Sequence, residues 1–113
     1  MSELINRLRS YGADMDATME RFVGDEALYD RCFRMFLQDP SFADLEKALS
    51  QKDYTAAFNA AHTLKGVAGN LGLTPLYAKI CEIVEALRHQ DYSNLTQQHE
   101  AILSAKEEVD KLQ

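Results

Sequence analysis

Apolar residues recur at helical spacing along nearly the whole chain, and nowhere do they alternate convincingly with polar residues as strand residues do. The last part of the chain, for example, places Leu95, Ile102, Val109 and Leu112 on one side of a helix. We therefore predict an all-α fold with no sheet. With 113 residues, the chain is long enough to bury a core and is expected to form a single helical domain, residues 1–113.

Glycine and proline residues divide this pattern into a series of predicted helices. A first short helix follows Ser2, its expected N-cap, and ends at Gly12, and its apolar side carries Leu4, Ile5, Leu8 and Tyr11. A second runs from about residue 15 to residue 23, where Gly24 stops it. These two short helices form a predicted N-terminal extension of the domain, about residues 1–23.

The next predicted helix spans about residues 25–38 and is broken or kinked at Pro40. Its apolar side is expected to carry Leu28, Cys32, Met35 and Phe36, with Phe33 nearby. Ser41 is then expected to cap a continuation whose inward side carries Phe42, Leu45, Ala48 and Leu49.

Three longer helices are predicted to follow, over about residues 53–71, 74–89 and 92–112. Because the connections between them are short, consecutive helices should be antiparallel neighbours. The sequence therefore predicts an antiparallel up-down four-helix bundle with additional short N-terminal helices, and the bundle core should cover about residues 25–112.

Short polar motifs mark the ends of these longer helices. Asp53 and Asp91 each precede a tyrosine and a hydroxyl residue, and each is the expected N-cap of the helix that follows it. Gly72 is expected to end the helix before it, and Thr74-Pro75 should provide a cap and a proline at the first helical position of the next.

The overall charge and hydropathy limit the classes of partner. The net charge is −6 and the isoelectric point is near 4.9, which argues against nucleic acid as the main partner because phosphate-backbone binding needs clustered Lys and Arg. No apolar run approaches the length of a membrane span, and the first residues lack a secretory apolar stretch. We expect a cytoplasmic monomer that contacts neither nucleic acid nor membrane.

The cysteines and histidines show no spacing typical of a metal site. Cys32 and Cys81 lie far apart among apolar neighbours, so we expect reduced thiols in the core. His62, His89 and His99 show no helical i,i+4 pairing with one another. We expect no metal and no cofactor.

His62 is expected to point away from the core. On a helix with about 100° per residue, one side of the predicted 53–71 helix carries Ala57, Ala60, Leu64, Ala68 and Leu71. These small and aliphatic residues define the buried side. Because His62 falls almost opposite to them on the wheel, its imidazole should face solvent.

The residues that share the exposed side with His62 are Thr55, Phe58, Asn59, Lys65, Gly66 and Gly69. Gly66 and Gly69 should each cost roughly 1 kcal/mol of helix stability relative to alanine, so we interpret them as bare surface over which another protein approaches the imidazole. Lys65 lies one turn away and can pair with an anion carried on the ring. Phe58 is an apolar residue on an exposed side, which indicates contact with a partner.

These residues suit phosphoryl transfer. A histidine side chain is mostly neutral at pH 7, so one ring nitrogen offers a nucleophilic lone pair. The sequence contains no phosphate loop of the G-x-x-x-x-G-K-[ST] type and no obvious cluster of carboxylates for Mg²⁺. The chain should therefore not use ATP by itself, and a partner should supply the metal and most of the catalysis.

The run from Ala61 to Gly72, AHTLKGVAGNLG, resembles the signature of histidine-containing phosphotransfer (HPt) domains, of the pattern H-x-[LI]-K-G-x-[AS]-x-x-[LIV]-G. The resemblance implies a phosphorelay intermediate in which His62 accepts a phosphoryl group from a receiver-domain aspartate. By the same resemblance, Lys65 stabilises the phosphoryl group, Gly66 lets the receiver approach, and Gly69 occupies a position that is commonly small.

The resemblance also implies the partners. These would be receiver domains of hybrid histidine kinases, which give the phosphoryl group, and of response regulators, which take it. The protein would be a phosphohistidine carrier and not an enzyme. Together with Phe58 and Asn59, which share the exposed side with His62, Gly66 and Gly69 would form its receiver-docking surface. The starting Met1 and the full set of predicted helices favour a free-standing protein over a segment of a larger kinase.

Three alternatives stay open at this point. The chain could be a helical interaction module that binds through the His62 side without chemistry, or an autonomous enzyme that uses His62 as a general base, although no Asp or Glu is evidently placed to orient the ring. It could also be the histidine domain of a chemotaxis-type kinase, phosphorylated directly by an ATP-binding domain.

Overall fold

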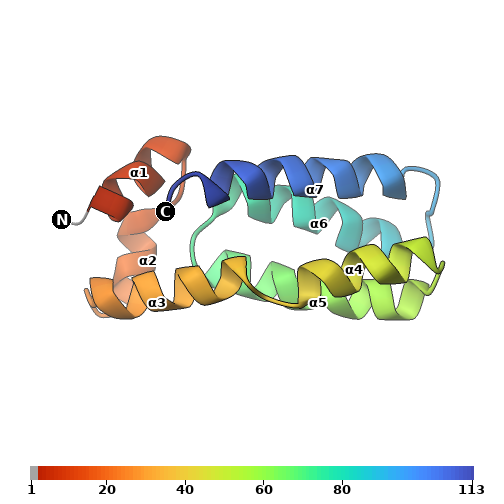
Figure 1. Ribbon diagram of the computed structural model, residues 1–113, viewed down its shortest axis with the longest axis horizontal. Helices are drawn as coiled ribbons and strands as arrows, with labels where there is room; N and C mark the ends of the chain where they lie inside the picture. The colour runs from red at the N-terminus through yellow and green to blue at the C-terminus, as the bar shows by residue number, and fades with distance from the viewer. Residues whose placement is uncertain (1–2) are drawn as a thin grey trace.

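The computed structural model describes residues 3–113, which form seven helices and no strand (Figure 1). The molecule is elongated, with principal extents of 43 × 21 × 20 Å. The helices are α1 (Glu3–Tyr11), α2 (Met15–Arg21), α3 (Glu26–Leu37), α4 (Ser41–Ser50), α5 (Tyr54–Asn70), α6 (Thr74–Arg88) and α7 (Leu95–Asp110). The predicted all-α fold is confirmed.

The long helices form an antiparallel bundle in which each packs against its neighbour in sequence. Helix α4 packs against α5, α5 against α6, and α6 against α7, while α3 extends the line of α4 beyond the break at Pro40 (Figure 1). Helices α1 and α2 lie at the end of the bundle where α7 finishes, and Arg7 Nη1 of α1 donates to the carbonyl of Leu112 at 2.9 Å. The predicted bundle with additional N-terminal helices is therefore what the chain forms.

Helix α5 turns the predicted side toward the core. The five residues that the helical wheel placed opposite His62 are all buried, four of them on α5 and Leu71 at its C-cap, and Ala61 is buried with them. Four of the six are alanines, and their small side chains let the neighbouring helices approach α5 closely. The larger Leu64 fills the space between them and is fully buried, which stabilises the fold by about 1.5–3 kcal/mol.

Helix α3 buries Phe36 and the nearby Phe33 as predicted, but it is rotated so that Leu28 and Met35 face outward. Met35 is 67% exposed and Leu28 is 37% exposed, whereas the residues that face the core are Tyr29, Phe33, Phe36 and Leu37. The rings of Tyr29 and Phe33 stack at 6.2 Å between centroids. Both sides of α3 are apolar, and the aromatic side is buried because its rings remove more apolar surface from water.

The cysteine prediction is half right. Cys32 and Cys81 are free thiols, as expected, but both are only partly buried and do not lie in the core. The correction for Cys32 follows from the rotation of α3, because the side that carries Leu28 and Met35 faces outward.

The predicted N-cap Asp53 is confirmed, and the predicted N-cap Asp91 is wrong. The Asp53 carboxylate accepts from the Ala56 amide at 3.1 Å. Helix α7, by contrast, begins at Leu95 and not at residue 92, and Asp91 instead accepts from the amide and the hydroxyl of Ser93, at 3.2 and 2.6 Å. This local turn satisfies the carboxylate before the helix begins, and it lowers the pKa of Asp91.

Two other predicted caps lie one or two positions from the observed ones. Ser41 is the first residue of α4, and its amide donates to the carboxylate of Asp39 at 2.8 Å. The side chain that accepts a hydrogen bond at the start of this helix is therefore that of Asp39. Thr74 is likewise inside α6, whose N-cap is Leu73.

The predicted cap Ser2 lies outside the described residues. The second predicted helix also ends earlier, at residue 21.

Contacts from α3 and from the start of α2 hold the segment that follows α5. The buried hydroxyl of Tyr29 donates to the carbonyl of Leu71 at 2.7 Å, and the Asp14 amide donates to the carbonyl of Gly72 at 3.0 Å. Leu71 and Gly72 are the two residues that directly follow α5, so these bonds tie the carboxyl end of the helix to α2 and α3. The structure thus fixes the helix that carries His62 at the end nearest α2.

No helix in the part of the chain from residue 3 to residue 113 is long and apolar enough to cross a membrane.

Candidate functional site

His62 lies in the middle of α5, on the side opposite the core, and its side chain is exposed. It lies at the edge of a shallow surface hollow, which we call the His62 hollow. Helix α5 contributes most of the lining, α2 contributes one residue and α6 another: the hollow is lined by Arg21, His62, Lys65, Gly66, Gly69, Asn70 and Tyr77.

The His62 ring rests on an aromatic support. The ring of Phe58, one turn earlier on α5, stacks against it at 5.7 Å between centroids and 25° between planes. The Arg88 guanidinium of α6 lies over the same Phe58 ring at 5.6 Å from its centroid. Phe58 is therefore half-buried between His62 and Arg88, and it limits the positions that the imidazole can adopt.

Both nitrogens of the His62 ring are open to a reactant. Within residues 3–113, the imidazole has no hydrogen bond and no ion pair, and no carboxylate orients it. A neutral imidazole in this setting keeps a lone pair on one nitrogen that a phosphorus centre can reach from solvent. The geometry fits a nucleophile that a partner approaches, and it does not provide the oriented base of a self-sufficient hydrolase.

Lys65 supplies a positive charge beside His62. It lies three residues along α5, so the two side chains share a side of the helix. Its side chain is half-buried, and its ammonium has no ion pair among the residues that the structure describes. The ammonium is therefore available to an anion on the ring.

The two glycines of the His62 hollow have different structural settings. A Cβ atom built on Gly66 would have no neighbour within 4 Å, whereas one built on Gly69 would lie 3.1 Å from the ring of Tyr77. Gly69 thus leaves room for a side chain of α6, and no neighbour inside the described chain accounts for Gly66. The bare surface at Gly66 points to contact with something outside this chain.

We expect opposite effects on stability when each glycine is replaced by alanine. Gly66→Ala should raise the free energy of unfolding by about 0.5–1 kcal/mol, because a glycine inside a helix is unfavourable and the new methyl group meets open space. Gly69→Ala should leave it unchanged or lower it, because the methyl group must displace the Tyr77 ring. Urea unfolding measures both. Equal stabilisation by the two variants would contradict the packing of Tyr77 against Gly69.

The structure does not bring all the predicted site residues to one place. His62, Lys65, Gly66 and Gly69 share the His62 hollow. Phe58 lines a separate depression with residues from the end of α6 and from the α6–α7 connection, including Arg88 and Tyr92. Asn59 is exposed and lines another one between α4 and α5.

Three residues of the His62 hollow were not predicted from the sequence: Asn70, which lies on α5 itself, and two residues from other helices, Tyr77 and Arg21. Tyr77 of α6 packs on Gly69, and its hydrogen bond with the Cys81 side chain raises the pKa of the Tyr77 hydroxyl. Arg21 of α2 donates from Nη2 to the carbonyls of Gly69 and Asn70, at 3.2 and 2.9 Å. Neither has a signal in the local pattern, because both reach α5 from other helices.

Among residues 3–113, no group of three or more His, Cys, Asp or Glu side chains could together hold a metal ion.

Comparison with known families gives one match. The family model described as "Hpt domain" matches residues 31–113, a segment that contains the second half of α3 and all of α4 to α7. It includes His62 and Lys65 but leaves out Arg21. The comparisons with curated proteins and with solved structures found no significant match.

Proposed function

Because the chain belongs to the Hpt domain family, whose members carry phosphoryl groups in two-component phosphorelays, we propose that His62 is its phosphoacceptor. Hpt domains are phosphocarrier modules and not catalysts, and they interact with receiver domains. We propose that a receiver domain of a hybrid kinase gives the phosphoryl group to His62. His62 then passes it to the receiver domain of a response regulator.

The observation that carries this proposal is the open setting of the imidazole. His62 is exposed, lacks hydrogen-bond partners within residues 3–113, and has the unpaired ammonium of Lys65 on its own side of α5. In the transfer step, a ring nitrogen of His62 attacks the phosphorus of the receiver's aspartyl phosphate. A nitrogen–phosphorus bond forms, the bond from phosphorus to the aspartate oxygen breaks, and the aspartate leaves as a carboxylate. The second transfer reverses these bonds on another receiver.

Each neighbour of His62 has a role in this scheme. Lys65 offsets the negative charge of the phosphoryl group on the ring. Phe58 holds the ring by stacking, at 5.7 Å between centroids. Gly66, which has no neighbour within 4 Å of its missing side chain, keeps the surface low enough for the receiver to approach.

The docking surface extends beyond the His62 hollow. We propose that Phe58 and Asn59, in the depressions on either side, contact the receiver together with Gly66 and Gly69. In this scheme the receiver supplies Mg²⁺ and most of the transition-state stabilisation.

The direct test is transfer without ATP. A receiver domain is phosphorylated with a labelled small-molecule phosphodonor, freed of the donor, and mixed with this protein and Mg²⁺. We expect label to move to the protein in a linkage that acid breaks and base does not. A protein that takes up label only from ATP and a kinase domain would contradict receiver-dependent transfer and support the chemotaxis-type alternative.

A further inference from the structure

The His62 hollow contains a second cation that comes from outside the family match. Arg21 is the last residue of α2, and α2 precedes the matched residues 31–113. Its side chain crosses to the carboxyl end of α5 and lines the same hollow as His62 and Lys65.

Arg21 is held in place by one of its two terminal nitrogens. Nη2 donates to the carbonyl of Gly69 at 3.2 Å, to the carbonyl of Asn70 at 2.9 Å, and to the hydroxyl of Thr18 at 3.0 Å. Thr18 is fully buried, and its hydroxyl in turn donates to the carbonyl of Asp14. The guanidinium is thereby fixed at the negative end of the α5 dipole.

The other donors of this guanidinium have no partner. Among the described residues, neither Nε nor Nη1 of Arg21 makes a hydrogen bond, although the residue is exposed. A guanidinium carries five N–H donors in a planar fork that matches a carboxylate or a phosphate. Arg21 therefore offers a fixed, partly unused fork to an anion that approaches from solvent.

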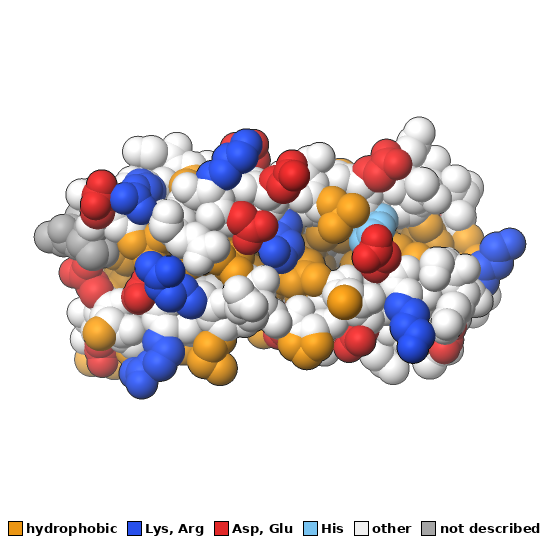
Figure 2. All heavy atoms as spheres, in the orientation of Figure 1, with side chains coloured by type: hydrophobic (Ala, Val, Ile, Leu, Met, Phe, Trp, Pro, Cys, Tyr) orange, Lys and Arg blue, Asp and Glu red, His pale blue; other side chains and the backbone are white. Residues whose placement is uncertain are grey.

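The charge of the His62 hollow differs from that of the whole chain. The chain has a net charge of −6, and Figure 2 shows acidic and basic side chains mixed over the face that it draws. The lining of the His62 hollow, in contrast, includes Arg21 and Lys65 and contains no Asp or Glu. A local positive site on an acidic protein selects a negatively charged partner surface.

The distance along α5 decides what Arg21 contacts. Its anchors, Gly69 and Asn70, lie seven and eight residues beyond His62, which corresponds to about 10 Å along the helix axis. Side chains on a helix also lean toward its N-terminus, so the His62 ring leans away from Arg21. Lys65 lies between them, and its ammonium is the cation that can pair with an anion on the His62 ring. Arg21 is anchored farther along the helix, so an anion that it pairs with lies beside the transfer site and not on the His62 ring.

Resting on the function proposed above, we propose that Arg21 is a docking residue for the carboxylates around the receiver's phosphorylated aspartate. A site that holds Mg²⁺ beside an aspartyl phosphate needs carboxylate ligands, so this part of the receiver is acidic. Arg21 pairs with that acidic rim and thereby helps to set which receivers bind. Helix α2 thus adds a specificity residue to the part of the bundle that the family match covers.

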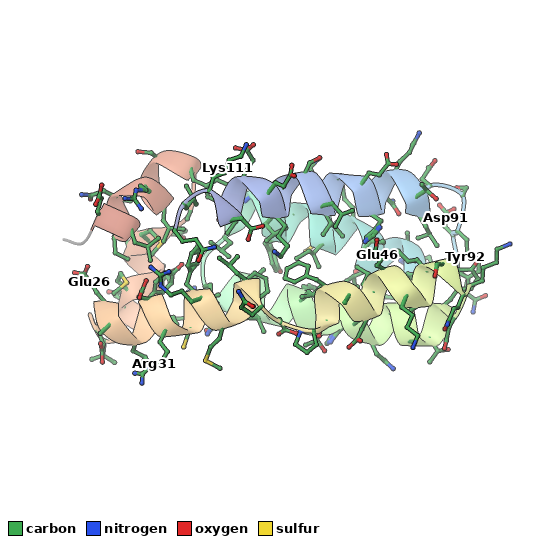
Figure 3. The ribbon with its side chains drawn as sticks, viewed as in Figure 1. Glu26, Arg31, Glu46, Asp91, Tyr92 and Lys111 are labelled. Carbon is green, nitrogen blue, oxygen red and sulfur yellow. The ribbon has the colours of Figure 1, made fainter. Side chains whose placement is uncertain are left out.

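The test is the concentration dependence of transfer from phosphorylated receiver to the full chain. For Arg21→Gln, we expect the half-saturating receiver concentration to rise about five- to tenfold, with the maximal rate within about twofold of wild type. Arg31→Gln is the matched control, because Arg31 is exposed on α3 and points away from the bundle (Figure 3). It makes the same change of charge and should shift neither quantity by more than about twofold.

The salt dependence separates a charge contact from loss of structure. The half-saturating concentration should depend less steeply on salt for Arg21→Gln than for wild type. Thr18→Val removes one of the three hydrogen bonds of Arg21 but keeps its charge and its bonds to the carbonyls of Gly69 and Asn70, so it should lower stability and retain the wild-type salt dependence. The proposal is overturned if Thr18→Val or Arg31→Gln reproduces the weaker salt dependence, or if Arg21→Gln lowers only the maximal rate.

Failure of this inference is distinguishable from failure of the proposed function. If wild-type protein takes label and Arg21→Gln behaves like wild type, only the docking role of Arg21 is wrong. If wild-type protein takes no label from any receiver, the proposed function itself is wrong.

Discussion

Replacement of His62 by glutamine should abolish uptake of label from a phosphorylated receiver. Glutamine is polar and of similar size, but its amide nitrogen shares its lone pair with the carbonyl group and cannot attack phosphorus. Because His62 is exposed and has no hydrogen bond within residues 3–113, the fold should be unaffected, with a change in unfolding free energy within about 0.5 kcal/mol. Label transfer and urea unfolding, measured on the same preparation, check both expectations.

The matched control is His89→Gln at the end of α6. His89 is also exposed, and its Nε2 lies 3.4 Å from a carboxylate oxygen of Glu85. It lies outside the His62 hollow, so its replacement should leave the amount of label unchanged. Labelling that survives in His62→Gln, or that is lost in His89→Gln, would show that the phosphoacceptor has been assigned to the wrong residue.

The same variant separates phosphoryl transfer from binding alone. In an interaction module without chemistry, His62→Gln would keep its partner and keep its effect in cells, whereas a carrier loses its output while it still docks. Bulky residues at Gly66 cannot make this distinction, because both functions need the open surface there. The family match favours the carrier, since Hpt domains act through phosphotransfer.

The sequence could predict that the His62 side chain faces solvent, because the apolar residues of α5 recur at clear helical spacing on the opposite side. Ala57, Leu64 and Leu71 repeat every seven residues, so their side is the only one on α5 that can form a continuous core contact. On α3 the same reasoning failed. Leu28 and Met35 compete there with Tyr29 and Phe33 for the interior, and periodicity alone cannot choose between two apolar sides.

The residues that complete the His62 hollow could not be found from local pattern. Arg21 precedes its acceptors Gly69 and Asn70 by 48 and 49 residues, and such contacts exist only after the helices have packed. Tyr77 likewise meets Gly69 across the α5–α6 pair. A glycine on an exposed helix side signals a close approach, but it does not say whether a neighbouring helix or another protein makes it.

Replacement of Gly72 by alanine should lower the free energy of unfolding more than replacement of Gly24 or Gly69 by alanine. Gly72 has φ +71°, a backbone conformation that costs a residue with a side chain about 1–2 kcal/mol. A Cβ atom there would also overlap the hydroxyl of Thr18 and lie 2.8 Å from the carbonyl oxygen of Asp14. Overpacking of this kind adds about 1–3 kcal/mol, so we expect urea unfolding to show a total loss of about 2–5 kcal/mol.

Gly24→Ala is the matched control that isolates the cost of placing a side chain on a residue with positive φ. Gly24 has nearly the same φ, +72°, but a Cβ atom built on it has no neighbour within 4 Å. This variant should lose only the backbone part, about 1–2 kcal/mol. Equal losses of unfolding free energy in Gly24→Ala and Gly72→Ala would mean that α2 does not pack closely against the α5–α6 turn.

A double variant tests the contact that makes Gly72 necessary. Thr18→Ala removes the hydroxyl that a Cβ at residue 72 would meet, so the two substitutions together should cost at least about 1 kcal/mol less than the sum of their separate losses. Thr18 also holds Arg21, whose Nη2 donates to it at 3.0 Å. The same close packing therefore keeps α2 on the α5–α6 turn and places Arg21 beside the His62 hollow. If Gly72→Ala forces α2 outward, as this geometry requires, it should also weaken the salt dependence of receiver binding, as Arg21→Gln does.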